Sequence, residues 1–239
     1  MIKLISVKTR RPDLSREEFR RHYEGRHVPL GLGFLERFRW RKYVRNHVVG
    51  TLAGAPDFDC LTEFWVASAD DRALTREFVQ SAEFQALDED DRRFLDGTRR
   101  LSFEVEEQLL SGPPRSVDPA GTRRLAMLIG GPSGAALAGA AAELGRRLAA
   151  ALPDPCPRIT LDRRVDDEAG PHEIAAVLSL WIRAGDGLPA WLRWPGAAEP
   201  WAVVDLEVVE TPPAALFHGA GETPGLPGSS RERSDGDAA

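Results

Sequence analysis

Short stretches of alternating hydrophobic and polar residues recur through the first half of the chain. Alternation with a two-residue period is typical of strands. The predicted strands are residues 2–9, 39–49, 60–68 and 101–110. Residues 16–26 and 70–94 instead place apolar side chains three or four positions apart, which predicts helices. Ser15 and Glu18 have capping-box spacing before the first helix, and Pro29 is expected to end that helix or to lie just past its end. The resulting order is β-α-β-β-α-β, the ferredoxin-like pattern.

The same order of elements returns in the second half of the chain, in a degenerate form. Its predicted strands are residues 124–130, 158–165, 173–183 and 201–210, with a helix at 133–152. Residues 189–194 stand in the place of the second helix. The predicted organisation is a first unit at 1–110, a linker at 111–122, a second unit at 123–211 and a disordered tail at 212–239, because linker and tail are rich in Gly and Pro.

Some of the predicted strands are apolar on both faces. In residues 173–183, Ile174, Leu178 and Leu180 alternate with Val177 and Trp181. A ferredoxin-like unit covers only one face of its sheet with helices, so an apolar second face needs another partner. We therefore predict an α+β protein in which two tandem ferredoxin-like βαββαβ units pair as one α+β barrel around a small ligand cavity.

Composition and charge narrow the classes of partner. The chain has 31 Lys and Arg against 37 Asp and Glu, a net charge of -6, and no basic stripe, which argues against nucleic acid. We expect a cytoplasmic protein with no membrane partner, because no apolar stretch is long enough to cross a bilayer. Cys60 and Cys156 are too few and too far apart for a disulfide framework or a zinc site.

Motifs for cofactors and metals are missing from the sequence, so we expect neither a cofactor nor a metal site. The acidic run 88–91 lacks the order of a calcium loop and is interpreted as a solvated helix face. The glycine-rich run 130–134 lacks the Lys-Ser/Thr pair of a phosphate-binding loop and is interpreted as a turn.

Several short motifs of the first half occur in a recognisable order. They are Met1-Ile2-Lys3-Leu4, Leu14-Ser15-Arg16-Glu17-Glu18-Phe19, His22-Tyr23, Arg26-His27-Val28-Pro29-Leu30, Tyr43-Val44-Arg45-Asn46-His47, Glu63-Phe64-Trp65 and the acidic stretch 87–96. On these motifs, roughly residues 1–110 resemble the EthD family of small dimeric α+β barrel proteins. The resemblance implies the barrel shared by polyketide cyclases, lactone isomerases, dehydratases and cofactor-independent oxygenases of aromatic substrates. Most such relatives are homodimers of one unit. This chain carries a second unit without the His-x-Pro and Asn-His motifs, so its barrel is expected to form within one chain. A homodimer of two whole chains is the alternative that this resemblance leaves open.

His27 is the first candidate for chemistry. It lies at the predicted end of the first helix, where the helix dipole favours the imidazolium and is expected to raise its pKa. Tyr23 lies one turn earlier on the same face, so the two side chains can meet and Tyr23 can contact a substrate. The alternatives are a general acid or base at a cavity mouth and a histidine that caps the helix carbonyls.

Three large polar residues share one face of the second predicted strand. Tyr43, Arg45 and His47 are two positions apart, and burying all three in a dry core would be unfavourable. They are interpreted as the lining of a wet cavity, with His47 as a base and with Tyr43 and Arg45 stabilising an enolate or phenolate oxygen. The alternative is a face exposed to solvent. Asn46 points the other way and is expected to be structural.

Glu63 and three tryptophans complete the candidates. Beside Trp65, the carboxyl group of Glu63 would be desolvated and suited to general-acid chemistry; the alternative is a salt bridge to Arg41 or Arg45. Trp65, Trp181 and Trp201 are interpreted either as flat walls for an aromatic substrate or as core residues.

Two classes of function follow from these residues. The first is a cofactor-independent acid/base enzyme acting on a small hydrophobic, aromatic or polyketide-type substrate, as a cyclase, dehydratase or isomerase. A cofactor-independent monooxygenase in the same cavity is the variant within that class. The second is a non-catalytic ligand-binding or structural relative, which the degenerate second half favours.

Overall fold

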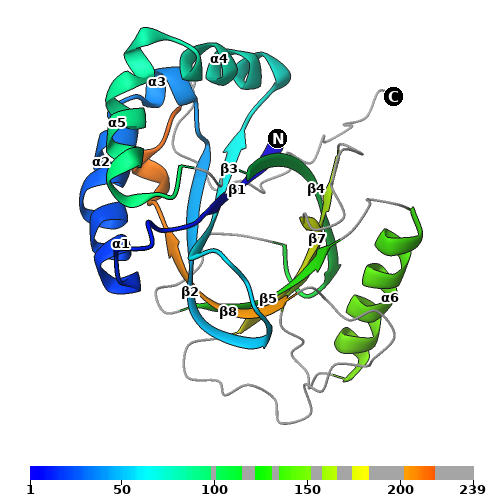
Figure 1. The fold of residues 1–239 in the computed structure, drawn as a ribbon. Helices are drawn as coiled ribbons and strands as arrows, with labels where there is room; N and C mark the ends of the chain where they lie inside the picture. The colour runs from blue at the N-terminus through cyan, green and yellow to red at the C-terminus, as the bar shows by residue number, and fades with distance from the viewer. Residues whose placement is uncertain are drawn as a thin grey trace, which may run out of the picture.

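Eight strands in the described part of the chain form a closed antiparallel barrel (Figure 1). The computed structural model describes residues 1–97, 101–114, 122–130, 135–151, 158–165, 174–182 and 202–218. The strands are β1 (Ile2–Lys8), β2 (Lys42–Gly54), β3 (Cys60–Val66), β4 (Leu101–Ser111), β5 (Arg123–Gly130), β6 (Ile159–Arg164), β7 (Ile174–Ile182) and β8 (Ala202–Glu210). The helices are α1 (Arg16–His22), α2 (Val28–Leu32), α3 (Leu35–Phe38), α4 (Ala69–Val79), α5 (Gln85–Phe94) and α6 (Ala135–Ala151).

Strand order around the barrel confirms the two ferredoxin-like units. The barrel runs β1-β3-β2-β8-β5-β7-β6-β4 and closes between β4 and β1. Each unit contributes four neighbouring strands in the same internal order, with its fourth strand beside its first. The two sheets meet edge to edge, at β2 with β8 and at β4 with β6. Closure within one chain leaves no sheet edge unpaired.

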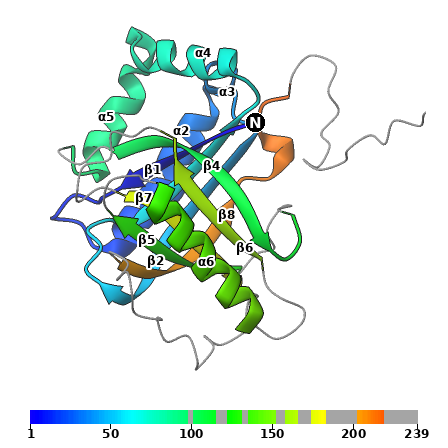
Figure 2. The ribbon, with the colours of Figure 1, turned by 90° about the vertical axis from the view of Figure 1, so that its right-hand side faces the viewer.

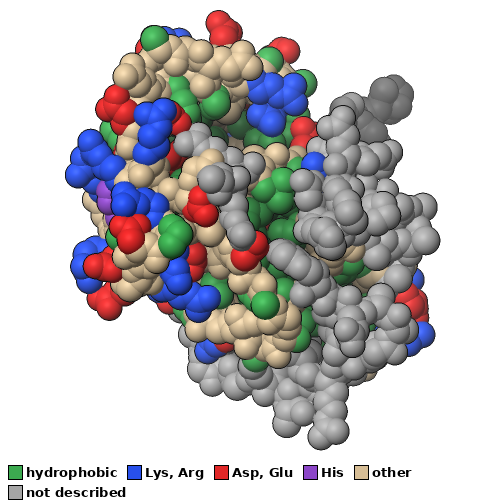
Figure 3. Space-filling model, in the orientation of Figure 1, with side chains coloured by type: hydrophobic (Ala, Val, Ile, Leu, Met, Phe, Trp, Pro, Cys, Tyr) green, Lys and Arg blue, Asp and Glu red, His purple; other side chains and the backbone are tan. Residues whose placement is uncertain are grey.

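The helices cover opposite sides of the barrel. Helices α1 to α5 pack outside the sheet of the first unit, whereas α6 lies across β4, β6 and β7 on the far side (Figures 1 and 2). Acidic and basic side chains are interspersed over α1 and α5 rather than gathered by sign (Figure 3). No helix in the described ranges is long and apolar enough to span a membrane.

The first predicted helix begins as the sequence indicates but does not end at Pro29. The backbone N–H of Glu18 donates to the Ser15 hydroxyl at 3.2 Å, and the backbone N–H of Ser15 donates to the Glu18 carboxylate at 2.9 Å. After α1 the chain forms a π-helical turn, Tyr23–His27, and then continues as α2. Pro29 has no N–H to donate, and it lies in the first turn of α2, where that loss is tolerated. The expected end of the helix is therefore wrong. The helical region 70–94 is interrupted near Ser81, between α4 and α5.

The strands are apolar on both faces because the paired sheets enclose one core inside the barrel and the helices cover others outside it, as predicted. Inside the barrel, apolar residues of both units form one cluster that includes Ile5, Leu61, Phe103 and Leu128. Outside the first sheet, a second cluster joins the sheet to α1–α5. Outside the second sheet, a third cluster packs under α6.

The expected disorder after Thr211 is wrong for the residues that follow it directly. Leu216 and Phe217 are 5% and 8% exposed, and the Phe217 N–H donates to the Trp40 carbonyl at 2.9 Å. The two apolar side chains anchor this segment to the first unit, although the surrounding composition is typical of a linker. The predictions for residues 131–134, 189–194 and 219–239, for Cys156 and for Trp201 lie outside the described residues.

Candidate functional site

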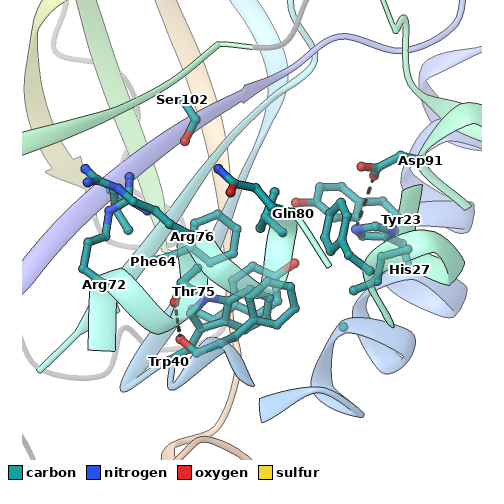
Figure 4. A pocket seen from close by; sticks show the side chains of 17 residues that line it. Tyr23, His27, Trp40, Phe64, Arg72, Thr75, Arg76, Gln80, Asp91 and Ser102 are labelled. Carbon is teal, nitrogen blue, oxygen red and sulfur yellow. Dashed lines mark hydrogen bonds and ion pairs between the residues drawn. The ribbon is translucent and has the colours of Figure 1, made fainter. Parts of the chain in front are cut away.

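A cavity of about 340 Å³ lies between the outer face of the first sheet and the helices that cover it (Figure 4). Aromatic rings form one wall. The rings of Trp40 and Phe38 are stacked 4.1 Å apart, and those of Tyr43 and Phe64 are stacked 5.0 Å apart. The Trp40 ring lies 4.7 Å from both Tyr43 and Phe64, which joins the two pairs. Such a surface favours a flat aromatic ligand.

His27 and two carboxylates occupy one end of this cavity. His27 Nδ1 lies 3.1 Å from Asp90 Oδ2, and Nε2 lies 3.6 Å from Asp91 Oδ1. Asp91 Oδ1 is buried and has no hydrogen-bond partner. Burial lowers the pKa of His27 and outweighs the nearby carboxylate of Asp91, which raises it. With Nδ1–H donating to Asp90, the neutral ring leaves Nε2 as an acceptor toward the cavity.

The expected increase in the pKa of His27 is wrong, and so is the capping alternative. Both rest on a helix that ends near His27, whereas the chain continues into α2. The predicted contact with Tyr23 is confirmed, since the two ring centroids are 5.5 Å apart. The π-helical turn carries both residues, and such turns occur frequently at functional sites.

A chain of buried hydroxyl groups runs beside the cavity. The hydroxyls of Tyr23 and Thr62 are 2.6 Å apart, Tyr23 is hydrogen-bonded to Tyr43, and the Cys60 thiol lies 3.7 Å from Thr62. Burial raises the pKa of both tyrosines well above the ordinary value, so both stay protonated. A chain of this kind has one more proton than it has internal bonds. If each group donates toward Tyr43, the Tyr43 hydroxyl keeps a proton for a ligand.

Two arginines line the other end of the cavity. Arg72 and Arg76 are one turn apart on α4 and lie across Phe64 from Asp91 and His27 (Figure 4). Arg72 Nε is buried and has no hydrogen-bond partner. Burial, and then the charge of Arg76, lower the pKa of Arg72. Ser102 and Gln80 add polar groups to the lining of the cavity.

Arg45 and His47 share the Tyr43 face of β2, as predicted, but they do not line this cavity. Both are buried under the first helix and contact Glu24, at 2.8 Å from Arg45 Nη2 and 2.6 Å from His47 Nε2. Burial alone would raise the pKa of Glu24, but hydrogen bonds from the His47 and Arg45 side chains outweigh burial and lower it to about 2. Arg45 also donates to the Thr211 hydroxyl. The expected wet, polar strand face is therefore wrong beyond Tyr43, because an ion pair with Glu24 compensates the buried charges.

Glu63 points into the barrel, away from the cavity. It is fully buried, 2.9 Å from Lys3 Nζ and 2.8 Å from Arg124 Nη1. A salt bridge was one of the two alternatives for Glu63, but its predicted partners Arg41 and Arg45 are wrong. Arg45 lies on the opposite face of the sheet, whereas Lys3 is on the neighbouring strand and Arg124 comes from the second unit.

The carboxylate of Asp162 completes an interior charge cluster with Lys3, Glu63 and Arg124. Asp162 lies 2.7 Å from Lys3 Nζ and 3.3 Å from Arg124 Nη2. Burial raises the pKa of Asp162 to about 6 against the attraction of Lys3. The four charged side chains are at most 3% exposed, so a buried polar cluster lies beside the apolar cluster inside the barrel.

Trp65 and Trp181 are part of this interior rather than walls of the cavity. The Lys3 and Lys42 ammonium groups lie 4.9 and 5.7 Å from the Trp65 ring. The Arg158 guanidinium lies 4.1 Å from the Trp181 ring. Of the two predicted roles the core role is therefore correct, because cations of the barrel interior occupy the space beside these rings.

Asp90 and Asp91 are among the residues that sequence reasoning missed. They are 1% and 8% exposed, so the prediction of a solvated helix face is wrong for both. The spacing held a signal, since Leu87, Asp91 and Phe94 share one helix face and Leu87 and Phe94 are buried. No cluster of three metal-ligating side chains occurs among the residues that the structure describes.

Comparison with known proteins supports the resemblance of the first unit. Residues 11–98 match the model of the EthD domain. No curated protein matches the chain. A solved structure of an EthD family protein from Bacillus halodurans is 22% identical, with 45% of this chain and 99% of that chain covered and a TM-score of 0.35. An anthrone oxidase-like protein is 13% identical, with 87% of this chain and 92% of that chain covered and a TM-score of 0.46.

Proposed function

Starting from an EthD-like first unit, we propose that the cavity beside Trp40 binds a small planar aromatic molecule and that His27 transfers a proton to or from it. One observation carries the proposal. His27 and Asp91 line the same cavity as a wall of aromatic rings, and a buried carboxylate oxygen of Asp91, 3.6 Å from His27 Nε2, accepts no hydrogen bond. Such an oxygen is unfavourable unless a ligand hydroxyl donates to it.

His27 acts as the base in this proposal. Its lowered pKa keeps the imidazole neutral near pH 7, so Nε2 can accept a proton from an acidic C–H or O–H of the ligand. Asp90 accepts from Nδ1–H, which fixes the ring and stabilises the imidazolium once it forms. Arg26 and His22 also contact Asp90, at 3.0 and 3.1 Å, and hold its carboxylate in place.

The tyrosines act as donors in the same step. The ligand oxygen that gains negative charge accepts a hydrogen bond from the Tyr43 hydroxyl, and Tyr23 supports Tyr43 from behind. Enolisation of this kind begins isomerisation, dehydration and cyclisation alike, which gives the proposed reaction class. It also begins cofactor-independent oxygenation, in which the carbanion reacts directly with oxygen. Consumption of oxygen separates the two outcomes.

Anthrone tests the proposal because its CH2 group is acidic and its rings are planar. Deuterium incorporation at that CH2 is followed by mass spectrometry in D2O under nitrogen, and oxygen uptake is followed in air. The wild-type protein is expected to accelerate exchange. His27→Ala should lower the acceleration roughly a hundredfold, as for loss of a general base. His218→Ala is the matched control, because His218 contacts the Pro213 carbonyl outside the cavity.

Two results would contradict the proposal. One is wild-type exchange no faster than exchange in buffer. The other is equal exchange in the His27→Ala and wild-type proteins. Binding of anthrone without any exchange would favour a ligand-binding protein over an enzyme. Fluorescence titration of anthrone with each variant shows whether binding survives the loss of the imidazole.

A further inference from the structure

We infer that the cavity selects aromatic molecules bearing an anion, with a planar carboxylate held by Arg72 and Arg76 and a hydroxyl group held by Asp91 and His27. This inference rests on the proposed function, since it names the substrate class of the same cavity. It adds Arg72 and Arg76, which the proton transfer leaves unexplained, to Asp91 and His27 at the other end of the cavity.

The guanidinium groups of Arg72 and Arg76 differ in their pairing from those of the other helix arginines in the first unit. Elsewhere in the first unit the arginines of the helices are paired, for example Arg37 with Glu83 at 2.7 Å and Arg20 with Glu207 at 2.6 Å. Arg72 and Arg76 form no ion pair within the described residues, although Arg72 Nε is buried. Two like charges one turn apart on a helix destabilise it slightly.

The charges that surround Arg72 leave room for an anion. The carboxylate of Glu104, on β4, raises the pKa of Arg72 through its charge, although Glu104 forms no hydrogen bond or ion pair with Arg72. The charge of Arg76, on the same helix, lowers the pKa of Arg72. A bound anion would relieve the repulsion between the two arginines. A carboxylate matches the guanidinium fork best, because two parallel N–H groups can donate to its two oxygens.

The opposite end of the cavity fixes the orientation of such a ligand. Asp91 is 8% exposed, and its Oδ1 atom lacks a hydrogen-bond donor. A second anionic group would be repelled there, whereas a hydroxyl can donate to it. Between the ends, the rings of Trp40, Tyr43 and Phe64 provide the flat contact for the aromatic body of the ligand. The cavity therefore differs chemically from one end to the other.

Three probes of similar shape separate these contributions. The first is a hydroxynaphthoate with its hydroxyl and carboxylate on opposite rings; the second is naphthol, which lacks the carboxylate; the third is naphthoate, which lacks the hydroxyl. Binding is measured by fluorescence titration at low and high salt. We expect the hydroxynaphthoate to bind the full-length protein about tenfold more tightly than naphthol, as for one charged hydrogen-bonded pair.

The double variant Arg72→Gln/Arg76→Gln should remove that advantage, with naphthol affinity unchanged within about twofold, as for a probe that has no carboxylate to pair with the two arginines. The matched control is Arg21→Gln/Arg92→Gln. It removes the same charge from α1 and α5, at side chains that are 70% and 64% exposed and absent from the cavity lining. The control should leave all three affinities unchanged. Circular dichroism checks that each variant folds.

The outcomes distinguish the two proposals. If naphthol and the hydroxynaphthoate bind the wild-type protein equally, or if the arginine variant weakens both probes alike, the anion-binding inference is overturned and the aromatic cavity stands. Equal losses in the control variant would also overturn it, because the effect would then come from net charge. If no probe binds, both the inference and the proposed function are wrong.

Discussion

Replacing Arg124 with methionine should destabilise the protein strongly, because it breaks the interior charge cluster that joins the two units. Arg124 is fully buried and donates to Glu63 at 2.8 Å, to Asp162 at 3.3 Å and to Ser179 at 2.8 Å. Methionine keeps much of the side-chain volume but removes all three hydrogen bonds. Lys3 then remains as the cation within reach of both carboxylates.

The size of the effect follows from the burial. Breaking a buried ion pair by removing one partner costs about 3–5 kcal/mol, since the remaining charge loses its compensation. We expect Arg124→Met to lower the free energy of unfolding by about that amount at pH 7. The loss should be smaller at pH 5, because the pKa of Asp162 is already raised to about 6 and a protonated carboxyl needs no partner.

Arg123→Met is the matched control, since Arg123 is the preceding residue on β5 and points to the outside. Its side chain is 45% exposed and pairs with Asp205, which is 7% exposed, so its loss should cost about 1–2 kcal/mol, less than the loss of Arg124. Urea unfolding followed by tryptophan fluorescence measures both variants. Adding Glu63→Gln to Arg124→Met should recover part of the stability, because it removes one uncompensated carboxylate. Equal losses in the two single variants, or a double variant weaker than Arg124→Met, would refute this reasoning.

Three further predictions concern pH dependence and the cavity. The pKa of Asp162 is raised from 3.8 to about 6, so the protonated carboxyl contributes roughly 3 kcal/mol of stability below pH 4, and this contribution is lost as the pH rises through 6. In urea unfolding, Asp162→Asn should therefore make the free energy of unfolding less dependent on pH between 4 and 6. The pKa of Glu24 is lowered from 4.5 to about 2, so its contribution is present above pH 4.5 and lost as the pH falls toward 2. Glu24→Gln should therefore cost about 2 kcal/mol at pH 7 and clearly less at pH 3 in the same assay. Gly31→Leu should fill the cavity beside Trp40, whose ring lies 3.6 Å from a Cβ at that position. Naphthol affinity should fall about tenfold, while the free energy of unfolding changes by less than about 1 kcal/mol. Unchanged naphthol affinity would contradict the assignment of the cavity.

Alternation along the strands predicted which side chains share a face, but not where each face points. Tyr43, Arg45 and His47 were correctly placed together, and Glu63 with Trp65 was correctly placed as a second set. Both faces of the first sheet carry apolar residues, so the pattern could not distinguish the helix-covered face from the barrel interior. The partners of Glu63 come from residues 60 and 61 positions away in the chain, which no local pattern reveals.

The two ends of the cavity differ in how far the sequence predicted them. Tyr23, His27 and Tyr43 were candidates from motif and spacing, and the structure brings them to one cavity. Asp91 was visible only as part of an acidic run, although its spacing from Leu87 indicated a buried face. Arg72 had no signal, because an arginine near the start of a polar helix is common, and its position opposite His27 depends on how α4 packs over the sheet.

A crystal structure of the protein with the hydroxynaphthoate bound would test the central claim most directly. The account predicts the ligand in the cavity between the first sheet and its helices, with its rings beside Trp40 and Phe64 and its hydroxyl within hydrogen-bond distance of Asp91 or His27. A ligand bound instead inside the barrel, beside Trp65 and the interior charge cluster, would contradict it.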